Sequence, residues 1–253
     1  IAEAGFFGAA IGAAMTSWHE LGGYKSKKKV EPHYHAYWGP SFSKTYLDKL
    51  IEKESKKIKN ENCIIEFSDK ISEISKIAAK EIADGKVIGW FQGRMEWGPR
   101  ALGNRSIICD PRRKDMKDIL NLKIKKRESF RPFAPSILRE YVTDWFEQDD
   151  DVPFMMQVYK IIKQKRSQIP AVTHVDGSGR LQTVYEKTNP RYYSLISEFN
   201  KLTGVPIVLN TSFNENEPVV CKPEEALETF LRTKMDILIL GNWIIQRKKD
   251  FLG

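Results

Sequence analysis

The chain has 253 residues, of which 41% are hydrophobic and 29% charged, so it can bury a core of ordinary size. This composition excludes a wholly disordered chain and a collagen-like one. Lys and Arg number 41 against 33 Asp and Glu, which gives a formal net charge of +8. Three widely spaced cysteines argue against a disulfide framework or a structural zinc site, and no apolar run approaches the ~20 residues of a membrane span. We therefore expect a cytoplasmic protein that does not enter a membrane.

The basic excess lies in one segment of the chain. Residues 82–139 contain 14 Lys and Arg against 6 Asp and Glu, whereas the remaining residues hold 27 of each sign. A concentrated basic segment indicates an anionic partner, such as the phosphates of a small molecule, nucleic acid or an acidic membrane. A solvated basic face is the alternative interpretation.

The first third of the chain is predicted to be mostly helical. Residues 1–18 are rich in Gly and Ala, which indicates a helix that packs closely on a neighbouring backbone. We expect a loop over 22–46 with a lysine run at 25–29, an exposed helix over 44–59, a short strand over 62–67 and an amphipathic helix over 69–84.

From Lys86 onward, strands and helices alternate, which predicts an α/β domain with a mixed sheet. The predicted strands are 87–91, 106–109, 133–138, 157–162 and 206–210, with a final hairpin of 237–240 and 244–246. The predicted helices are 101–104, 114–122, 191–202 and 223–232. A further hairpin of 171–176 with 181–185 is expected around the turn Gly177-Ser178-Gly179.

Arginines between glycines form the first candidate site. Arg94, Arg100 and Arg105 lie on a predicted strand–loop–helix, and their guanidinium groups match phosphate or carboxylate oxygens. Structural ion pairs with acids such as Glu96 and Asp110 are the alternative.

A second basic stretch, residues 125–136, combines four cations within seven residues with a Phe-x-Pro-Phe-x-Pro pattern. Because prolines fix the backbone, we expect Lys125 and Arg131 to point into a cleft. Phe130 and Phe133 are expected to be anchored in the fold, which argues against a flexible nucleic-acid-binding arm.

Short polar residues follow the predicted strand 206–210, and ligands of α/β sheets bind beyond the carboxyl ends of strands. The sequence Asn210-Thr211-Ser212-Phe213-Asn214 is therefore a candidate nucleotide contact, with a turn-rich loop as the alternative. Arg180 is predicted at the tip of the 171–185 hairpin, and His174 is expected to be a structural hydrogen-bonding residue. No metal site is predicted from these residues.

In their order and spacing, these segments resemble the C-terminal part of the NodU/CmcH/TobZ-type O-carbamoyltransferases. The matching stretches are 90–106, 125–136, 174–180 and 210–214, within a match that covers most of 86–247. The resemblance implies two parts: residues 1–45 as the tail and linker of an actin-like (Kae1-like) transfer domain, and residues 46–253 as a YrdC-like domain. The latter is an open twisted mixed sheet with flanking helices.

The resemblance also implies a function. A YrdC-like domain makes carbamoyl-adenylate from carbamoyl phosphate and ATP and releases pyrophosphate, with Mg²⁺ on the triphosphate. The Kae1-like domain transfers the carbamoyl group to a hydroxyl-bearing acceptor small molecule. The K-x-R and S-x-N elements of YrdC-like folds fall on residues 125–127 and 212–214. Lys125 and Arg131 are the implied catalytic residues, and the implied ligand-binding residues are Arg100, Arg180, Asn210, Ser212 and Asn214.

One position departs from the family. Its Gly-Asp-x-Gly motif, whose Asp ligates iron in the Kae1-like domain, reads Gly5-Phe6-Phe7-Gly8 here. Phe cannot ligate a metal, so either Glu3 takes that place or the iron site is altered. The rest of the transfer domain is not in this sequence, and we expect a fragment or one half of a split protein.

A binding module is the alternative to an enzyme. Such a module would use a basic concave surface to bind nucleotide or RNA without turnover, and its binding to polynucleotides would depend strongly on salt. The Asn-Thr-Ser-Phe-Asn cluster and Arg180 favour the enzyme, so nucleic acid is not the expected partner.

Overall fold

The computed structural model describes residues 6–22, 34–128 and 130–248. The expectations for Glu3, Gly5 and the lysine run at 25–29 lie outside these residues.

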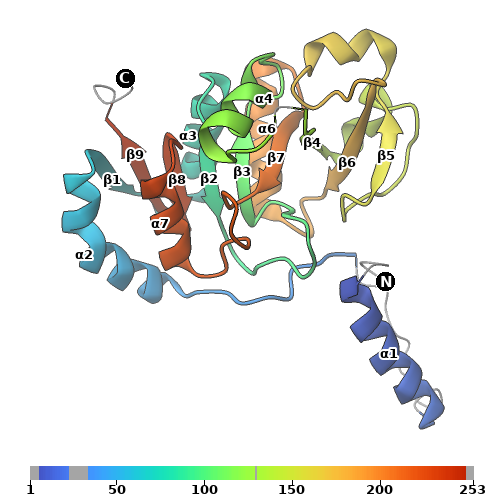
Figure 1. Cartoon of the computed structure of the whole chain (residues 1–253), viewed down its shortest axis with the longest axis horizontal. Helices are drawn as coiled ribbons and strands as arrows, with labels where there is room; N and C mark the ends of the chain where they lie inside the picture. The colour runs from blue at the N-terminus through green and yellow to red at the C-terminus, as the bar shows by residue number, and fades with distance from the viewer. Residues whose placement is uncertain (1–5, 23–33, 129, 249–253) are drawn as a thin grey trace.

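Nine strands form one open sheet within the described part of the chain (Figure 1). They are β1 (Cys63–Phe67), β2 (Ile88–Phe91), β3 (Arg105–Cys109), β4 (Ala134–Leu138), β5 (Gln157–Lys160), β6 (Ser178–Val184), β7 (Ile207–Ser212), β8 (Ile237–Leu240) and β9 (Trp243–Arg247). Their order is β1-β9-β8-β2-β3-β7-β4-β6-β5. The pairs β2/β8 and β4/β6 are parallel and the other pairs are antiparallel. The predicted mixed α/β sheet is confirmed.

Helices flank this sheet, except α1 (Phe6–Glu20), which projects away from it (Figure 1). The other α-helices are α2 (Lys44–Asn60), α3 (Ile71–Ala83), α4 (Met116–Asp118), α5 (Val142–Trp145), α6 (Pro190–Thr203) and α7 (Pro223–Arg232). Asn189 caps α6 by accepting the Tyr192 N–H, and Gly204 ends the helix in the left-handed region at φ 71°. The predicted helices 44–59, 69–84, 191–202 and 223–232 are confirmed within a few residues.

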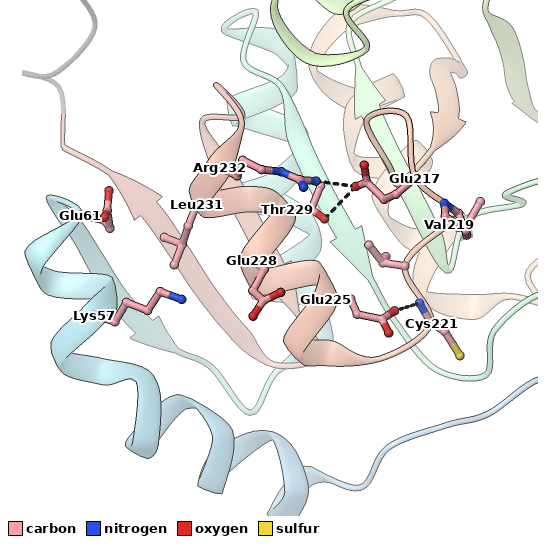
Figure 2. A pocket seen from close by; sticks show the side chains of 12 residues that line it. Lys57, Glu61, Glu217, Val219, Cys221, Glu225, Glu228, Thr229, Leu231 and Arg232 are labelled. Carbon is pink, nitrogen blue, oxygen red and sulfur yellow. Dashed lines mark hydrogen bonds and ion pairs between the residues drawn. The ribbon is translucent and has the colours of Figure 1, made fainter.

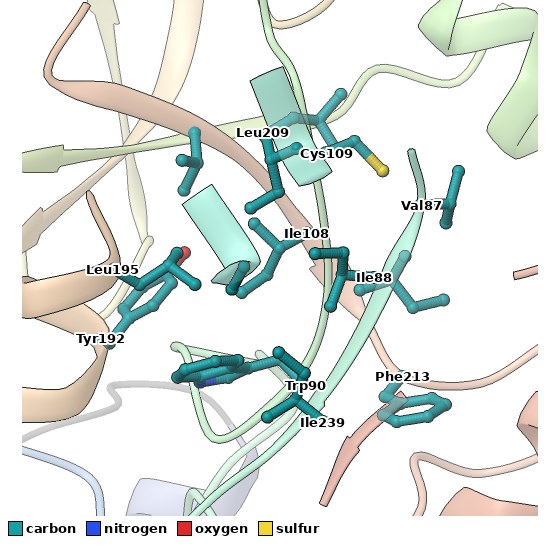
Figure 3. Packing of buried hydrophobic residues seen from close by; sticks show 14 of the residues in the cluster. Val87, Ile88, Trp90, Ile108, Cys109, Tyr192, Leu195, Leu209, Phe213 and Ile239 are labelled. Atoms are coloured by element: carbon teal, nitrogen blue, oxygen red, sulfur yellow. The ribbon is translucent and has the colours of Figure 1, made fainter. Parts of the chain in front are cut away.

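The main hydrophobic core lies between the central strands and these helices. Figure 3 shows Trp90 of β2 and Ile108 of β3 packed beside Tyr192 and Leu195 of α6. All four are buried. The strands that carry the polar residues discussed below are therefore held in a rigid, dry interior.

A second, smaller cluster joins the segment before α2 to the sheet. It contains Ala36, Leu102, Ala134 and Met155. Leu102 of the loop between β2 and β3 therefore packs with apolar residues that precede and follow this loop in the sequence.

Two arginines of the first predicted motif bind backbone rather than face a ligand. Arg94 donates to the Trp38 carbonyl (2.9 Å) and the Gly39 carbonyl (3.2 Å). Arg105 is fully buried and donates to the carbonyls of Gln92 (2.6 Å) and Asn104 (2.8 Å). These bonds fasten residues 38–39 and the loop after β2 to the domain.

Several sequence predictions of local structure were wrong. Residues 101–104 form a loop rather than a helix, and residues 171–176 form no strand. Instead, Gly177 turns the chain at φ 78°, and β6 begins at Ser178 and pairs with β5 and β4. The predicted helix 114–122 is a short α4 followed by a π-helical segment, η2 (Ile119–Ile124).

The described residues include no helix with the length and apolar character needed to cross a bilayer. Cys63, Cys109 and Cys221 are free thiols.

Candidate functional site

A cleft of about 260 Å³ lies beside the end of β7. Its walls come from the loop between β2 and β3, the segment after η2, residue 155, β6 and β7. The lining residues are Pro99, Arg100, Ala101, Arg127, Arg131, Pro132, Phe133, Met155, Arg180, Asn210, Thr211 and Ser212. Four are arginines and none is acidic, so the cleft suits a polyanion.

The charges of these arginines are mostly not neutralised by the protein. Arg131 pairs with Glu128 (3.0 Å), and both side chains are about half exposed. Arg127 donates from Nε to the Asn121 amide oxygen (2.8 Å). The other two nitrogens of its guanidinium group take no part in that bond. Among the described residues, Arg100, Arg127 and Arg180 have no carboxylate within ion-pair distance.

Arg180 lies in the middle of β6, opposite Val158 of β5, and not at a hairpin tip as predicted. Burial, followed by the nearby charges of Arg100 and Arg127, lowers its pKa to about 10. The Nε atoms of Arg100 and Arg180 are buried without a hydrogen-bond partner in the described structure. Both arginines therefore retain unused donors near the cleft.

Asn210 lies in β7 as predicted, but the strand continues through Ser212, which corrects the prediction that it ends at residue 210. Asn210 is 1% exposed, and its Nδ2 donates to the Ala101 carbonyl (3.1 Å) and the Gln182 amide oxygen (3.0 Å). Its Oδ1 is buried and has no partner among the described residues. One acceptor therefore remains available at the floor of the cleft.

Lys125 lies behind the cleft and does not line it. It is 2% exposed, and its Nζ contacts four oxygens of two residues: the carbonyls of Ser212 (2.5 Å) and Asn214 (2.8 Å), the Asn214 Oδ1 (2.7 Å) and the Ser212 Oγ (3.3 Å). Burial and then the charge of Arg127 lower its pKa to about 7. Lys125 therefore holds the end of β7 in place.

Five of the seven predicted site residues line one cleft: Arg100, Arg131, Arg180, Asn210 and Ser212. Lys125 and Asn214 support it from behind, since Asn214 accepts hydrogen bonds from both Lys125 and Ser212.

Seven lining residues are outside the predicted set, and Arg127 and Met155 are two of them. Arg127 ends the K-x-R element, which was the signal that could have found it. Met155 is buried at φ 54°, a conformation that nothing in its local sequence announces. Phe133 is buried as expected, but Phe130 is 81% exposed, so the expectation that it is anchored was wrong.

A larger hollow of about 670 Å³ lies between α2 and α7 (Figure 2). Its lining includes four carboxylates, Glu61, Glu217, Glu225 and Glu228, against Lys57 and Arg232. Glu217 already pairs with Arg232 (2.6 Å). This acidic balance does not suit phosphates, so the smaller arginine cleft is the candidate site. Within the described ranges, no three His, Cys, Asp or Glu side chains gather as metal ligands would.

Comparisons with known proteins give this geometry a context. Residues 79–247 match the protein family described as carbamoyltransferase C-terminus. Nodulation protein NolNO of Sinorhizobium fredii is 44% identical over 249 residues, which cover 95% of this chain and 35% of that protein. A 3'-hydroxymethylcephem-O-carbamoyltransferase of Amycolatopsis lactamdurans is 43% identical over 135 residues, which cover 53% of this chain and 25% of that protein.

Among solved structures, P. abyssi Sua5 complexed with L-threonine aligns with a TM-score of 0.48 and 14% identity, over 68% of this chain and 47% of that one. The chain spans less than half the length of the curated relatives that it matches.

Proposed function

We propose a reaction for this chain, which belongs to the carbamoyltransferase C-terminus family. In this proposal the arginine cleft forms carbamoyl-adenylate from ATP and carbamoyl phosphate and releases pyrophosphate. The observation that carries this proposal is a cleft lined by four arginines and no carboxylate, inside the residues that match the family. The carbamoyl group would then pass to an acceptor hydroxyl in another part of the protein.

The reaction brings anions together, which explains the need for this charge. Hydrolysis of carbamoyl phosphate gives phosphate and carbamate. A carbamate oxygen then attacks the α-phosphorus of ATP, and the bond from that phosphorus to the bridging oxygen of the β-phosphate breaks. Pyrophosphate leaves with that electron pair. Because nucleophile and target are both negative, cations must offset their repulsion and stabilise the charge that develops at the α-phosphate.

The residues fit separate tasks in this reaction. Arg131 is the most exposed of the cleft arginines, and release from Glu128 would free it for a phosphate. Arg180 and Arg100 offer buried guanidinium donors with no protein partner among the described residues. Asn210 and Ser212 offer short polar groups from the rigid strand β7. Mg²⁺ would arrive with the triphosphate and screen its charge.

Lys125 and Asn214 would act on this chemistry from behind the cleft. Lys125 binds the same two residues that form the ends of the S-x-N element. We therefore assign it a positioning role on Ser212 in place of direct contact with ATP.

The test is ATP consumption that depends on carbamoyl phosphate, with AMP and pyrophosphate as measured products. Arg180→Met should abolish pyrophosphate release, whereas Lys56→Ala, at an exposed position on α2, should leave it unchanged. Pyrophosphate release that is absent from the wild type, or that survives Arg180→Met, would contradict the proposal.

One observation favours the alternative of a nucleotide- or RNA-binding module. The exposed Phe130 ring adjoins Arg131 in the sequence, and nucleic-acid grooves combine cations with aromatic platforms. A module of this kind should bind poly(U) with an affinity that falls steeply between 50 and 200 mM salt, to an extent on the order of a thousandfold or more for many phosphate contacts. Such binding without pyrophosphate release would favour the module.

A further inference from the structure

The loop that delivers Arg100 to the cleft is closed by one buried carboxylate. Glu96 is 6% exposed, and its Oε1 accepts the backbone N–H groups of Leu102 (2.7 Å) and Asn104 (2.7 Å). Arg100 lies in the sequence between Glu96 and Leu102, inside the loop that these hydrogen bonds close. The carboxylate therefore replaces the hydrogen bonds that regular secondary structure would supply to these amides.

The outer side of the same loop is held by polar side chains from three other segments. Tyr37 donates to the Leu102 carbonyl (3.0 Å), Gln182 donates to the same carbonyl (2.8 Å), and Asn210 donates to the Ala101 carbonyl (3.1 Å). On the inner side of the loop, Glu96 accepts the hydrogen bonds from the backbone N–H groups. Its removal would leave two buried N–H groups without an acceptor, while the outer bonds would still anchor the carbonyls.

The charge of Glu96 strengthens this arrangement. Hydrogen bonds to an ionised acceptor are shorter and stronger than neutral ones. Burial raises the pKa of Glu96, while the backbone N–H groups and the charge of Arg105 oppose that rise. Its second oxygen, Oε2, is buried without a partner among the described residues. The Glu96 carboxylate therefore stabilises this loop conformation through hydrogen bonds to Oε1 alone.

We propose that Glu96 is a positioning residue that fixes Arg100 in the arginine cleft, an inference that rests on the function proposed for that cleft. Glu96 does not line the cleft, so it acts on a bound polyanion only through the loop. Loss of Glu96 should let residues 97–101 sample other conformations, and Arg100 would then contribute less to binding.

The experiment is a double-mutant cycle on the Kd for Mg-ATP, measured by calorimetry on the full chain. Glu96→Ala and Arg100→Ala should each weaken binding about tenfold, as for coupled neighbours. The double variant should bind within about twofold of Arg100→Ala alone, because a misplaced Arg100 and a missing Arg100 are equivalent. A matched cycle with Arg131→Ala should give multiplied effects, since Arg131 lies in the segment after η2 and not in the loop.

A second measurement covers the case in which Glu96→Ala fails to fold. Glu96→Gln keeps an acceptor oxygen but removes the charge, so it should weaken ATP binding about threefold, and only while Arg100 is present. Hydrogen exchange at the Leu102 and Asn104 amides should accelerate in the same variant.

The outcomes separate the two proposals. If Arg100→Ala weakens ATP binding, but Glu96→Ala weakens it further in a protein that already carries Arg100→Ala, the positioning role is wrong and the cleft stands. A wild type that does not bind ATP, or an Arg100→Ala variant that binds normally, overturns both.

Discussion

Removal of the unpaired cleft residue Arg180 should make the apo protein more stable while it removes ligand binding. We choose Arg180→Met, because methionine keeps much of the apolar stem and deletes the guanidinium. Arg180 is partly buried, carries an unpartnered Nε and lies near the charges of Arg100 and Arg127. Its charge therefore destabilises the empty cleft and becomes useful only when an anion is present.

The size of this effect follows from the shift of its pKa. The pKa of Arg180 falls from its ordinary value to about 10, and each factor of ten in the acid constant corresponds to about 1.4 kcal/mol between the two protonation states. The upper limit is thus roughly 3 kcal/mol, and solvent screening with lost stem packing leaves about 1–2 kcal/mol. The charged form is disfavoured throughout the range below pH 10, so the penalty is fully present near neutrality and declines only as the pH rises above about 10.

Thermal unfolding gives the measurement. A gain of about 1–2 kcal/mol should raise the apo midpoint by roughly 2–8 °C in a domain of this size. Saturating Mg-ATP should raise the midpoint of the wild type further, by mass action, but should leave that of Arg180→Met almost unchanged.

Arg139→Met is the matched control, since Arg139 is also partly buried but pairs with Asp149 (2.6 Å) and Asp151 (2.5 Å) outside the cleft. Its carboxylate partners raise the pKa of Arg139, so its removal should lower the midpoint and preserve the ATP shift. If Arg180→Met also destabilises the apo protein, or retains the full ATP shift, the argument from unpaired charge is refuted.

Two further substitutions separate support from contact. Lys125→Met should lower the apo midpoint by about 4–12 °C, because buried oxygens of Ser212 and Asn214 would lose their hydrogen-bond donor at a cost of roughly 2–3 kcal/mol; an unchanged midpoint in a thermal scan would contradict its structural role. Arg131→Ala should weaken ATP binding by about ten- to a hundredfold in calorimetry and leave the midpoint nearly unchanged, whereas Lys56→Ala should alter neither; equal losses would mean that general basicity drives binding.

The amphipathic helices could be predicted because their information is local. α3 has Ile74, Ala78 and Ile82 on one buried face, and α6 has a capping Asn, a Pro in its first turn and Gly204 at its end. Periodicity and caps act within a few residues, so the sequence alone determines these elements closely.

The loop after β2 and the turn before β6 could not be predicted for the opposite reason. Leu102 and Asn104 satisfy their amides through Glu96, and Leu102 satisfies its carbonyl through Gln182, which lies 80 positions away. Asp176 stabilises its turn by accepting the N–H and hydroxyl of Ser178. These conformations depend on side-chain contacts that no short sequence window contains.

The site itself was predicted as a set of residues but not as an arrangement. Three of the four arginines that line the cleft, Arg100, Arg131 and Arg180, belong to the set that the family resemblance implies, whereas Arg127 does not. Whether Lys125 enters the cleft or lies behind it depends on the π-helical segment η2, which ends at Ile124 and turns the lysine inward. That irregular turn has no sequence signature comparable to a helix cap.

Two buried ionisable side chains, Glu96 and Lys125, thus support two walls of one cleft. Glu96 binds the amides of the loop that carries Arg100, and Lys125 binds the carbonyls at the end of the strand that carries Ser212. Each uses main-chain groups as its main partners, so each fixes backbone geometry directly rather than through another flexible side chain. Arg100, Arg127 and Arg180 can then remain without carboxylate partners and available to a polyanion, because the order of the walls does not depend on ion pairs made by these arginines. A protein that relied on Arg100 or Arg180 for internal ion pairs would have to break them at every binding event.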